Sequence, residues 1–174
     1  HGLGQWTFLL TVLSGGTCVL STDRHFDAAS AWRLVDDEGV ELMQVIGDAL
    51  ARPLADELRR HGDLSDLSKL RMIGSAGAVL SPAVVADLGE LLPHEKVVNR
   101  FGASETGPQG RVTQRAGEDA PRLASDGSTL VLDEDFRPLP PGSDQVGLLA
   151  RTGHIPLGYW GDEAKTARTF PVVD

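Results

Sequence analysis

The fold is decided by the sequence KVVNRFGASETG, residues 96–107, in which an apolar run leads into small and polar residues. The apolar run predicts a β-strand over Lys96–Phe101 that runs out into a loop. The loop carries a glycine, a hydroxyl and a carboxylate directly after an aromatic ring. Open α/β sheets bind ligands beyond the carboxyl ends of their strands. The segment therefore predicts a strand end that holds a ligand.

The side chains of this segment suit a nucleotide. Phe101 offers a flat face on which adenine can stack, worth about 0.5–1.5 kcal/mol beyond burial. The Asn99 amide can donate and accept at once, which matches the adenine edge. Gly102 permits close backbone approach, and Ser104 offers a hydroxyl to a phosphate oxygen. Glu105 is a hard oxygen ligand of the kind that Mg²⁺ takes alongside substrate phosphates. Taken by itself, the pattern also fits a strand end followed by a capped turn.

Hydrophobic periodicity predicts alternating strands and helices on either side of this segment. This order is typical of an α/β fold, with a parallel sheet flanked by helices. After Gly107 the texture changes to short β segments and turns, which predicts a small antiparallel β subdomain. We therefore expect one domain over residues 1–107 and a second over 108–174. The predicted helices are 5–13, 26–38, 49–60 and one that begins at Ser81-Pro82, and the predicted strands are 17–21, 42–46, 70–74, 96–101 and 129–132.

The run Phe101-Gly102-Ala103-Ser104-Glu105 resembles the aromatic-Gly-x-Thr-Glu signature of the AMP-forming adenylating enzymes. This superfamily contains acyl-CoA synthetases, peptide-synthetase adenylation domains and luciferases. The resemblance implies nucleotide-binding roles for Asn99, Phe101, Gly102 and Ser104. It also implies catalytic roles for Ser104 and Glu105, with Glu105 as the Mg²⁺ ligand.

An upstream turn, Met72–Pro82, is similar to the family's Gly-Ala-Pro-Leu turn, whose backbone lines the adenine and acyl pockets. Gly77, Ala78 and Leu80 align with it, while Val79 replaces the usual proline. The resemblance implies that Gly77 and Ala78 bind the nucleotide and that Leu80 contacts the substrate. Without it, the segment reads as a plain strand-to-helix turn.

A downstream segment, Val146–Phe170, looks like the family's Gly-Glu-Leu strand followed by Gly-Tyr-x₆-Thr-x₃-Phe. Leu148 stands where the family usually has glutamate. An alternative interpretation makes Tyr159 and Trp160 packing residues beside a turn, and for Trp160 we expect packing in either case.

The strand-to-helix junction at Gly47-Asp48 lies where acyl-CoA synthetases line the acyl pocket, so the resemblance implies that both residues lie near the acyl group. His1-Gly2 matches a family motif that gates this pocket, although His1 could equally be a cloning or processing remnant. The Ala/Asp/Arg-rich texture resembles actinobacterial synthetases that act on long-chain fatty acids or steroid side-chain acids.

The family's phosphate-binding loop and its late catalytic lysine are missing from the 174 residues. We therefore interpret the chain as the middle fragment of a longer acyl-CoA synthetase, inactive alone, whose other parts include a C-terminal domain. The parent would use ATP, Mg²⁺ and CoA to convert a carboxylic acid first to an acyl-adenylate and then to a thioester. The first alternative is a peptide-synthetase adenylation domain. The second is a non-catalytic nucleotide-binding α/β module, and a Rossmann oxidoreductase fits least because G-x-G-x-x-G is missing.

Composition predicts a globular piece with a real core, since 41% of the residues are hydrophobic. A net charge of −9 disfavours nucleic-acid binding. Cys18, the single cysteine, cannot form an internal disulfide, and its apolar surroundings predict burial. The apolar stretch near residues 8–20 is too short for a membrane span, and we expect a cytoplasmic location.

Overall fold

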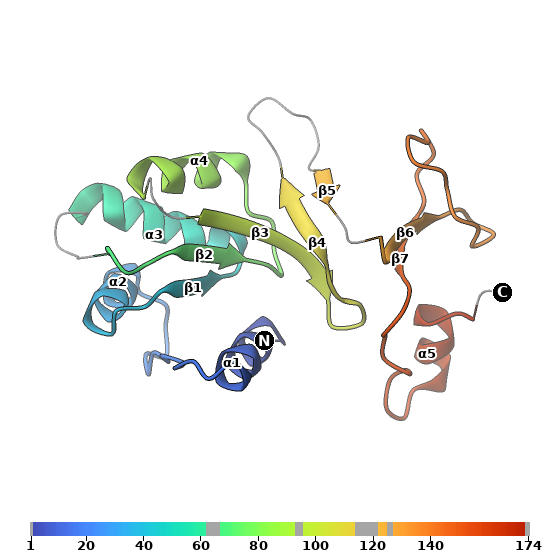
Figure 1. Ribbon diagram of the computed structural model, residues 1–174, viewed down its shortest axis with the longest axis horizontal. Coiled ribbons are helices and arrows are strands. Elements are labelled where there is room, and N and C mark those ends of the chain that lie inside the picture. The colour runs from blue at the N-terminus through green and yellow to red at the C-terminus, as the bar shows by residue number, and fades with distance from the viewer. Residues whose placement is uncertain (1, 62–66, 93–95, 114–121, 125–126, 173–174) are drawn as a thin grey trace. The chain divides into compact units, whose positions relative to one another are not determined.

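The computed structural model describes residues 2–61, 67–92, 96–113, 122–124 and 127–172 (Figure 1). The chain divides into two compact units. The first unit comprises residues 1–101 and 111–123, and the second comprises 102–110 and 124–174. The predicted domain boundary after Gly107 stays a prediction.

A parallel sheet forms the centre of the first unit. Strand β1 (Leu42–Val45) pairs with β2 (Met72–Ser75), and β2 pairs with β3 (Lys96–Ala103), both in parallel. Strands β4 (Gly107–Thr113) and β5 (Arg122–Ala124) extend the sheet in the order β1-β2-β3-β4-β5. The predicted α/β class and parallel pairing are confirmed, but the sheet continues beyond the strand that we expected to be the last.

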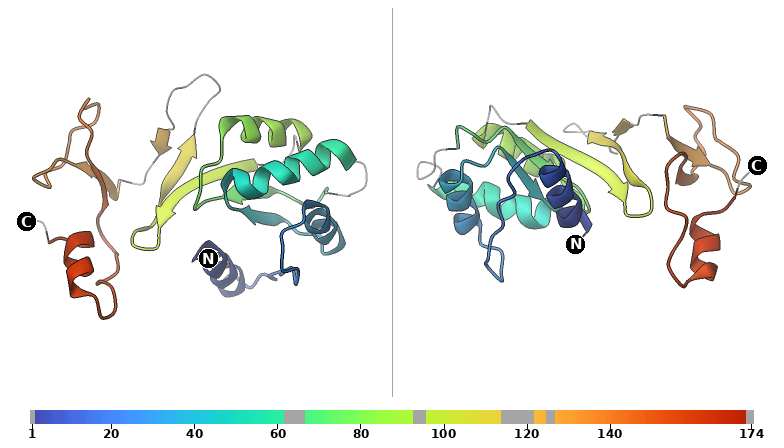
Figure 2. Two further views of the ribbon diagram at one scale, coloured as in Figure 1. Left: turned by 180° about the vertical axis from the view of Figure 1, so that it is seen from behind. Right: turned by 60° about the horizontal axis from the view of Figure 1, so that its bottom comes forward.

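Helices α3 (Gly47–His61) and α4 (Pro82–Leu91) follow β1 and β2 and pack side by side over one face of these strands (Figures 1 and 2). Ser81 caps α4 because its side chain accepts from the Val84 N–H, and Pro82 occupies the first turn, as the sequence predicts. The buried apolar faces of both helices meet the sheet. The fully buried side chains include Leu54, Ile73, Val84, Leu88 and Val45.

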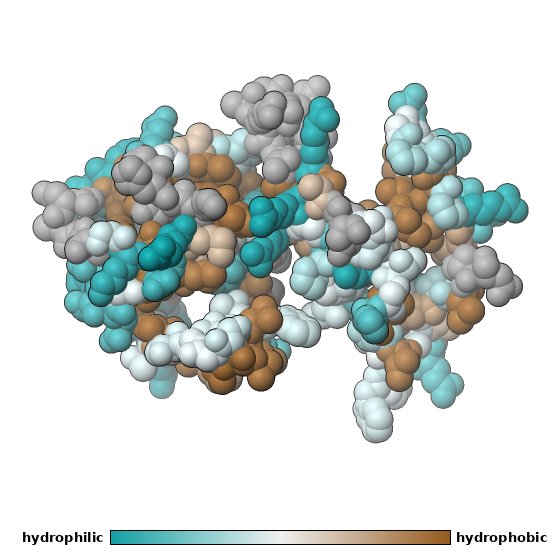
Figure 3. Space-filling model, viewed as in Figure 1, coloured by the Kyte–Doolittle hydropathy of each residue, from teal (hydrophilic) through white to brown (hydrophobic). Residues whose placement is uncertain are grey.

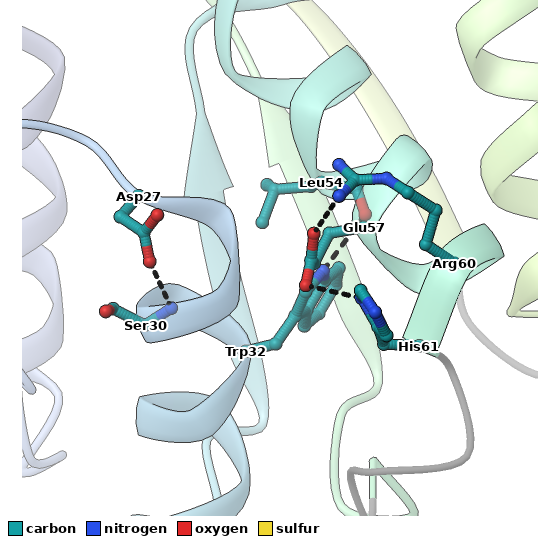
Figure 4. Close-up of polar contacts among 7 residues, drawn as sticks. All are labelled: Asp27, Ser30, Trp32, Leu54, Glu57, Arg60 and His61. Carbon is teal, nitrogen blue, oxygen red and sulfur yellow. Dashed lines mark hydrogen bonds and ion pairs between the residues drawn. The ribbon is translucent and has the colours of Figure 1, made fainter.

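Helix α2 (Ala28–Asp37) packs against α3 and begins at the N-cap Asp27, whose carboxylate accepts from the Ser30 N–H. Its Trp32 is only 2% exposed, and the indole N–H donates to the Leu54 carbonyl at 3.0 Å (Figure 4). A buried indole needs such a partner. Figure 4 also shows the Glu57 carboxylate of α3 between Arg60 and His61, whose nitrogens lie 3.1 and 3.0 Å from its two oxygens.

Helix α1 (Gly2–Leu13) confirms the first predicted helix, but none of its residues is buried. Figure 3 shows hydrophobic surface over this helix. Its exposed large side chains include Trp6, Leu10 and Leu13. In the part of the chain that the structure describes, no helix combines the length and the apolar character that crossing a membrane requires.

The strand predicted over residues 17–21 is wrong, because this segment has no regular secondary structure. A strand needs a neighbouring strand to pair with its backbone N–H and C=O groups. Among the strands that the structure describes, the sheet ends at β1, whose only neighbour in the strand order is β2, so residues 17–21 do not pair with it. Cys18, expected to be buried, is half-buried.

The second unit contains the predicted antiparallel pair. Strand β6 (Thr129–Leu132) pairs with β7 (Leu148–Arg151), and α5 (Glu163–Thr169) begins at the N-cap Asp162. Trp160, which we expected to pack beside the turn, is instead fully exposed. Its neighbour Tyr159 is the aromatic residue that packs at this turn, against Phe170.

Candidate functional site

The strand register of the first unit aligns the ends of three parallel strands. Val45 pairs with Ser75, and Ser75 pairs with Asn99. Gly47, Gly77 and Phe101 each follow two residues beyond this row. Because the carboxyl ends of parallel strands meet at one edge of a sheet, three predicted site segments converge there.

The junction after β1 is fastened to the turn after β2. The Gly47 N–H donates to the buried Ser75 hydroxyl at 3.1 Å, and the Asp48 N–H donates to the Val79 carbonyl at 2.9 Å. Gly47 has a φ of +55°, and a Cβ added to it would lie 2.4 Å from the Val79 oxygen. Only glycine tolerates both conditions, so Gly47 allows the close approach of the two segments.

The Asp48 carboxylate holds the same turn from α3. One oxygen accepts from the Ser81 N–H at 2.8 Å, and the other lies 3.3 Å from the Arg52 guanidinium. Partial burial by itself would raise the pKa of Asp48, but the Ser81 hydrogen bonds and Arg52 outweigh it and lower the pKa below 3.8. The carboxylate is thus already engaged by protein groups, and its nearness to an acyl group stays a prediction.

The predicted nucleotide-binding residues of this unit differ in their accessibility. Phe101 is 41% exposed, so part of its ring is free to stack. Gly77 and Ala78 are exposed and Asn99 is half-buried. Leu80, predicted to contact the substrate, is only 4% exposed and belongs to the core. Leu80 therefore helps to anchor the turn, and the exposed atoms of the turn come from its neighbours.

In the second unit, Ser104 and Glu105 lie in the turn that separates β3 from β4. Strand β3 runs to Ala103, two residues further than predicted, so Gly102 and Ala103 belong to the strand rather than to a loop. A Cβ on Gly102 would lie 2.4 Å from the Gly107 oxygen, which explains how the chain closes so tightly. Ser104 is exposed, and its roles stay predictions.

The side chain of Thr106 braces this turn from inside. Its hydroxyl accepts from the Ala103 N–H at 3.2 Å and lies 3.1 Å from the Gln109 amide oxygen, to which it can donate. Gln109 is buried, and its backbone carbonyl accepts from the Thr129 hydroxyl at 3.2 Å. These contacts fix the backbone that carries Glu105.

The Glu105 carboxylate accepts a 2.6 Å hydrogen bond from the Tyr159 hydroxyl. This bond is the main cause of a lowered pKa for Glu105, and the residue's own backbone N–H and the nearby Lys165 ammonium lower it further, against a small effect of burial. The carboxylate is therefore ionised at neutral pH. Sequence reasoning did not include Tyr159 among the site residues, although the Gly-Tyr-x₆-Thr-x₃-Phe spacing pointed to its segment.

A lone, partly accessible carboxylate fits Mg²⁺, because this ion is usually bound through one or two carboxylates together with substrate phosphates. Across the described residues, no cluster of three or more His, Cys, Asp or Glu side chains forms an all-protein metal cage. A hollow of about 370 Å³ in the second unit is lined mainly by Asp133–Asp135 and Val146, and it includes no predicted site residue. His1, predicted to contact the substrate, lies outside the described residues.

Comparison with known proteins gives a consistent result. A model of the AMP-binding enzyme family matches residues 1–160. The chain is 41% identical over 177 residues to the medium/long-chain-fatty-acid–CoA/3-oxocholest-4-en-26-oate–CoA ligase of Mycobacterium marinum, with 100% of this chain and 32% of that protein covered. It is 40% identical over 177 residues to the 3-oxocholest-4-en-26-oate–CoA ligase of Rhodococcus rhodochrous, covering 98% of this chain and 32% of that protein.

Among solved structures, the crystal structure of VinN superposes with a TM-score of 0.78 at 26% identity, over 96% of this chain and 41% of VinN. The chain spans about a third of the length of the two ligases named above. The family match extends over both units and includes the strand ends, the Glu105 turn and Tyr159. The chain belongs to the family of AMP-binding enzymes.

Proposed function

We propose that the full-length protein is an AMP-forming acid–thiol ligase. It activates a carboxylic acid with ATP to an acyl-adenylate and pyrophosphate, and then transfers the acyl group to the thiol of CoA. The observation that carries this proposal is the ionised Glu105 carboxylate, the last residue of the aromatic-Gly-x-Ser-Glu run, which accepts a hydrogen bond from Tyr159. The ligase names of the two relatives at 41% and 40% identity support it.

The proposed chemistry divides among a few residues. The substrate carboxylate attacks the α-phosphorus of ATP, and the bond to pyrophosphate breaks. Phe101 stacks on adenine, and the Asn99 amide and the backbone of Gly77 and Ala78 bind its edge. Ser104 donates to a phosphate oxygen. Glu105 holds Mg²⁺, which neutralises phosphate charge when bound, so catalysis here rests on positioning and charge stabilisation.

The proposed substrate is a long-chain fatty acid or a steroid side-chain carboxylic acid. The names of the two ligases, one for medium- and long-chain fatty acids and both for a cholestenoate, support this class. Gly47 lets the Val79 carbonyl approach the strand-to-helix junction, Asp48 holds the turn beside it, and we place both residues near the acyl group. Leu80 anchors that turn from the core, and His1 gates the pocket.

Other parts of the protein complete this proposal. Because the chain spans about a third of the length of the two ligases, we assign the phosphate-binding loop and the late catalytic lysine to segments beyond it, with the lysine in a C-terminal domain. We also propose that the protein works in the cytoplasm, where ATP and CoA are available to it.

The test is a mass-spectrometric assay of the full-length protein with ATP, Mg²⁺ and CoA and a panel of fatty acids and steroid side-chain acids. Formation of AMP together with acyl-CoA for one class of acid is the expected result, and it identifies the substrate. Acyl-adenylate without acyl-CoA would instead indicate a carrier-protein thiol as acceptor. Absence of AMP with every acid would overturn the proposal in favour of a non-catalytic nucleotide-binding module.

A further inference from the structure

Tyr159 makes four contacts within the second unit. Its backbone N–H donates to the Thr166 hydroxyl at 2.9 Å, and its ring centroid lies 5.6 Å from that of Phe170. The Lys165 ammonium lies 3.9 Å from the ring centroid, in cation–π geometry. The fourth contact is the 2.6 Å hydrogen bond from its hydroxyl to Glu105. The phenol is therefore anchored by groups other than the carboxylate that it binds.

The backbone beside Tyr159 is also fixed. Gly158 has a φ of +153°, and a Cβ added to it would lie 2.4 Å from the Thr166 methyl group. Thr166 in turn donates its hydroxyl to the Asp162 carbonyl at 2.7 Å, at the start of α5. The phenol thus belongs to a braced turn, whereas Glu105 projects from the hairpin turn on a flexible side chain. When the two bond to each other, the carboxylate is the partner that becomes ordered.

The hydrogen bond leaves the carboxylate able to bind a cation. An ionised carboxylate has about four lone-pair sites on its two oxygens, and the phenol occupies one of them on Oε1. A glutamate side chain gives up much rotamer freedom when it is ordered. Because Tyr159 imposes that order before any ligand arrives, it removes part of the cost of metal binding.

We propose that Tyr159 is a positioning residue, which orients the Glu105 carboxylate for the divalent cation that accompanies ATP. This inference rests on the proposed function, since it assumes that Glu105 is the cation ligand. Lys165 contributes by keeping the ring in place and by its positive charge beside the pair. Tyr159 itself does not touch the cation or the reacting atoms.

The direct test measures Mn²⁺ binding to the full-length protein in the presence of a non-hydrolysable ATP analogue, from the electron paramagnetic resonance signal of free Mn²⁺. Tyr159→Phe keeps the ring and its contacts with Phe170 and Lys165 but removes the hydroxyl. We expect Mn²⁺ affinity to fall about tenfold, equivalent to ~1.4 kcal/mol. Trp160→Phe is the matched control, because it changes an adjacent, fully exposed aromatic residue, and it should bind Mn²⁺ like the wild type.

A second variant tests whether the loss of Mn²⁺ affinity comes from the Tyr159–Glu105 pair rather than from a general loss of structure. Glu105→Asp keeps a carboxylate but draws it back from the phenol by one methylene group, and it should weaken Mn²⁺ binding to a similar degree. Unchanged Mn²⁺ affinity in either Tyr159→Phe or Glu105→Asp overturns the inference. A fall in the melting temperature of Tyr159→Phe well beyond that of Trp160→Phe also counts against it, because it would indicate a structural role.

Kinetics separate this inference from the proposed function. In a double-mutant cycle, Tyr159→Phe should lower kcat for adenylate formation in the wild-type background, with the KM for the acid unchanged, and should have no further effect in Glu105→Gln. If the wild-type enzyme makes AMP but the effects of Tyr159→Phe and Glu105→Gln on kcat are additive, the positioning role is refuted and the proposed function stands. A wild-type protein that makes no AMP with any acid refutes the proposed function, whatever its measured Mn²⁺ affinity.

Discussion

Replacing Gly47 with alanine should destabilise the α/β unit by about 3 kcal/mol. The left-handed φ of +55° costs an L-residue roughly 1–2 kcal/mol. The added Cβ would also lie 2.4 Å from the Val79 carbonyl oxygen and 2.9 Å from the Ala78 Cβ. Relief of this overlap requires a backbone shift, and such overpacking costs roughly 1–3 kcal/mol.

Two further glycines separate these contributions. Gly39 has nearly the same φ, +59°, but its added Cβ would meet only the flexible Lys69 side chain. Gly39→Ala should therefore cost about 1–2 kcal/mol, the conformational part alone. Gly89 lies in α4 with nothing within 4 Å, so Gly89→Ala should stabilise by roughly 0.5–1 kcal/mol.

The assay is urea-induced unfolding of the full-length protein, followed by tryptophan fluorescence, because Trp32 is buried in this unit. The free energy of unfolding should decrease in the order Gly89→Ala, wild type, Gly39→Ala, Gly47→Ala. Equal destabilisation by Gly39→Ala and Gly47→Ala would refute the reasoning, because the close approach of Gly47 to the Val79 carbonyl would then carry no cost.

Other substitutions test single contacts. Asp48→Asn should lower the free energy of unfolding by about 1 kcal/mol at pH 6, since the side chain is a third exposed. The pKa of Asp48 in the folded protein lies below 3.8. The difference in free energy of unfolding between wild type and Asp48→Asn should therefore be present above pH 3.8 and vanish as the pH falls through the folded pKa. Unfolding measurements on both proteins over an acid pH series will test this. Trp32→Phe removes the hydrogen bond to the Leu54 carbonyl and should lower urea stability by about 2 kcal/mol; a change below 0.5 kcal/mol would contradict its importance. Glu105→Gln should slow adenylate formation about 100-fold in a pyrophosphate-exchange assay with little change in melting temperature, and unchanged exchange would remove Glu105 from the chemistry.

Features set by neighbouring residues were predictable from the sequence. The start of α4 follows from Ser81 and Pro82, because a hydroxyl cap and a proline in the first turn act within a few residues. The ends of β1 and β2 were found to within two residues, since each apolar run stops at small residues. The meeting of the Gly47 and Gly77 segments then follows from the parallel register.

Features set by distant partners were not predictable. Residues 17–21 have strand-like composition, but composition cannot tell whether a neighbouring strand is available. Tyr159 and Trp160 are adjacent aromatic residues with opposite environments, because only one of them faces a carboxylate. The pairing of Tyr159 with Glu105 joins residues 54 positions apart, and no local pattern specifies it.

That separation of 54 residues affects the order in which the molecule matures on the ribosome. At 5–20 residues per second, translation needs about 3–10 s to pass from Glu105 to Tyr159. All residues of β1, α3, β2 and α4 have been synthesised before this interval begins. We therefore expect nascent chains stalled before Tyr159 to bind Mn²⁺ and ATP analogue more weakly than chains stalled well after α5, and equal binding would disprove this. By our proposal, an unfinished chain would carry the strand ends before Tyr159 is present to orient the Glu105 carboxylate, and cation binding would strengthen only after synthesis has passed Tyr159.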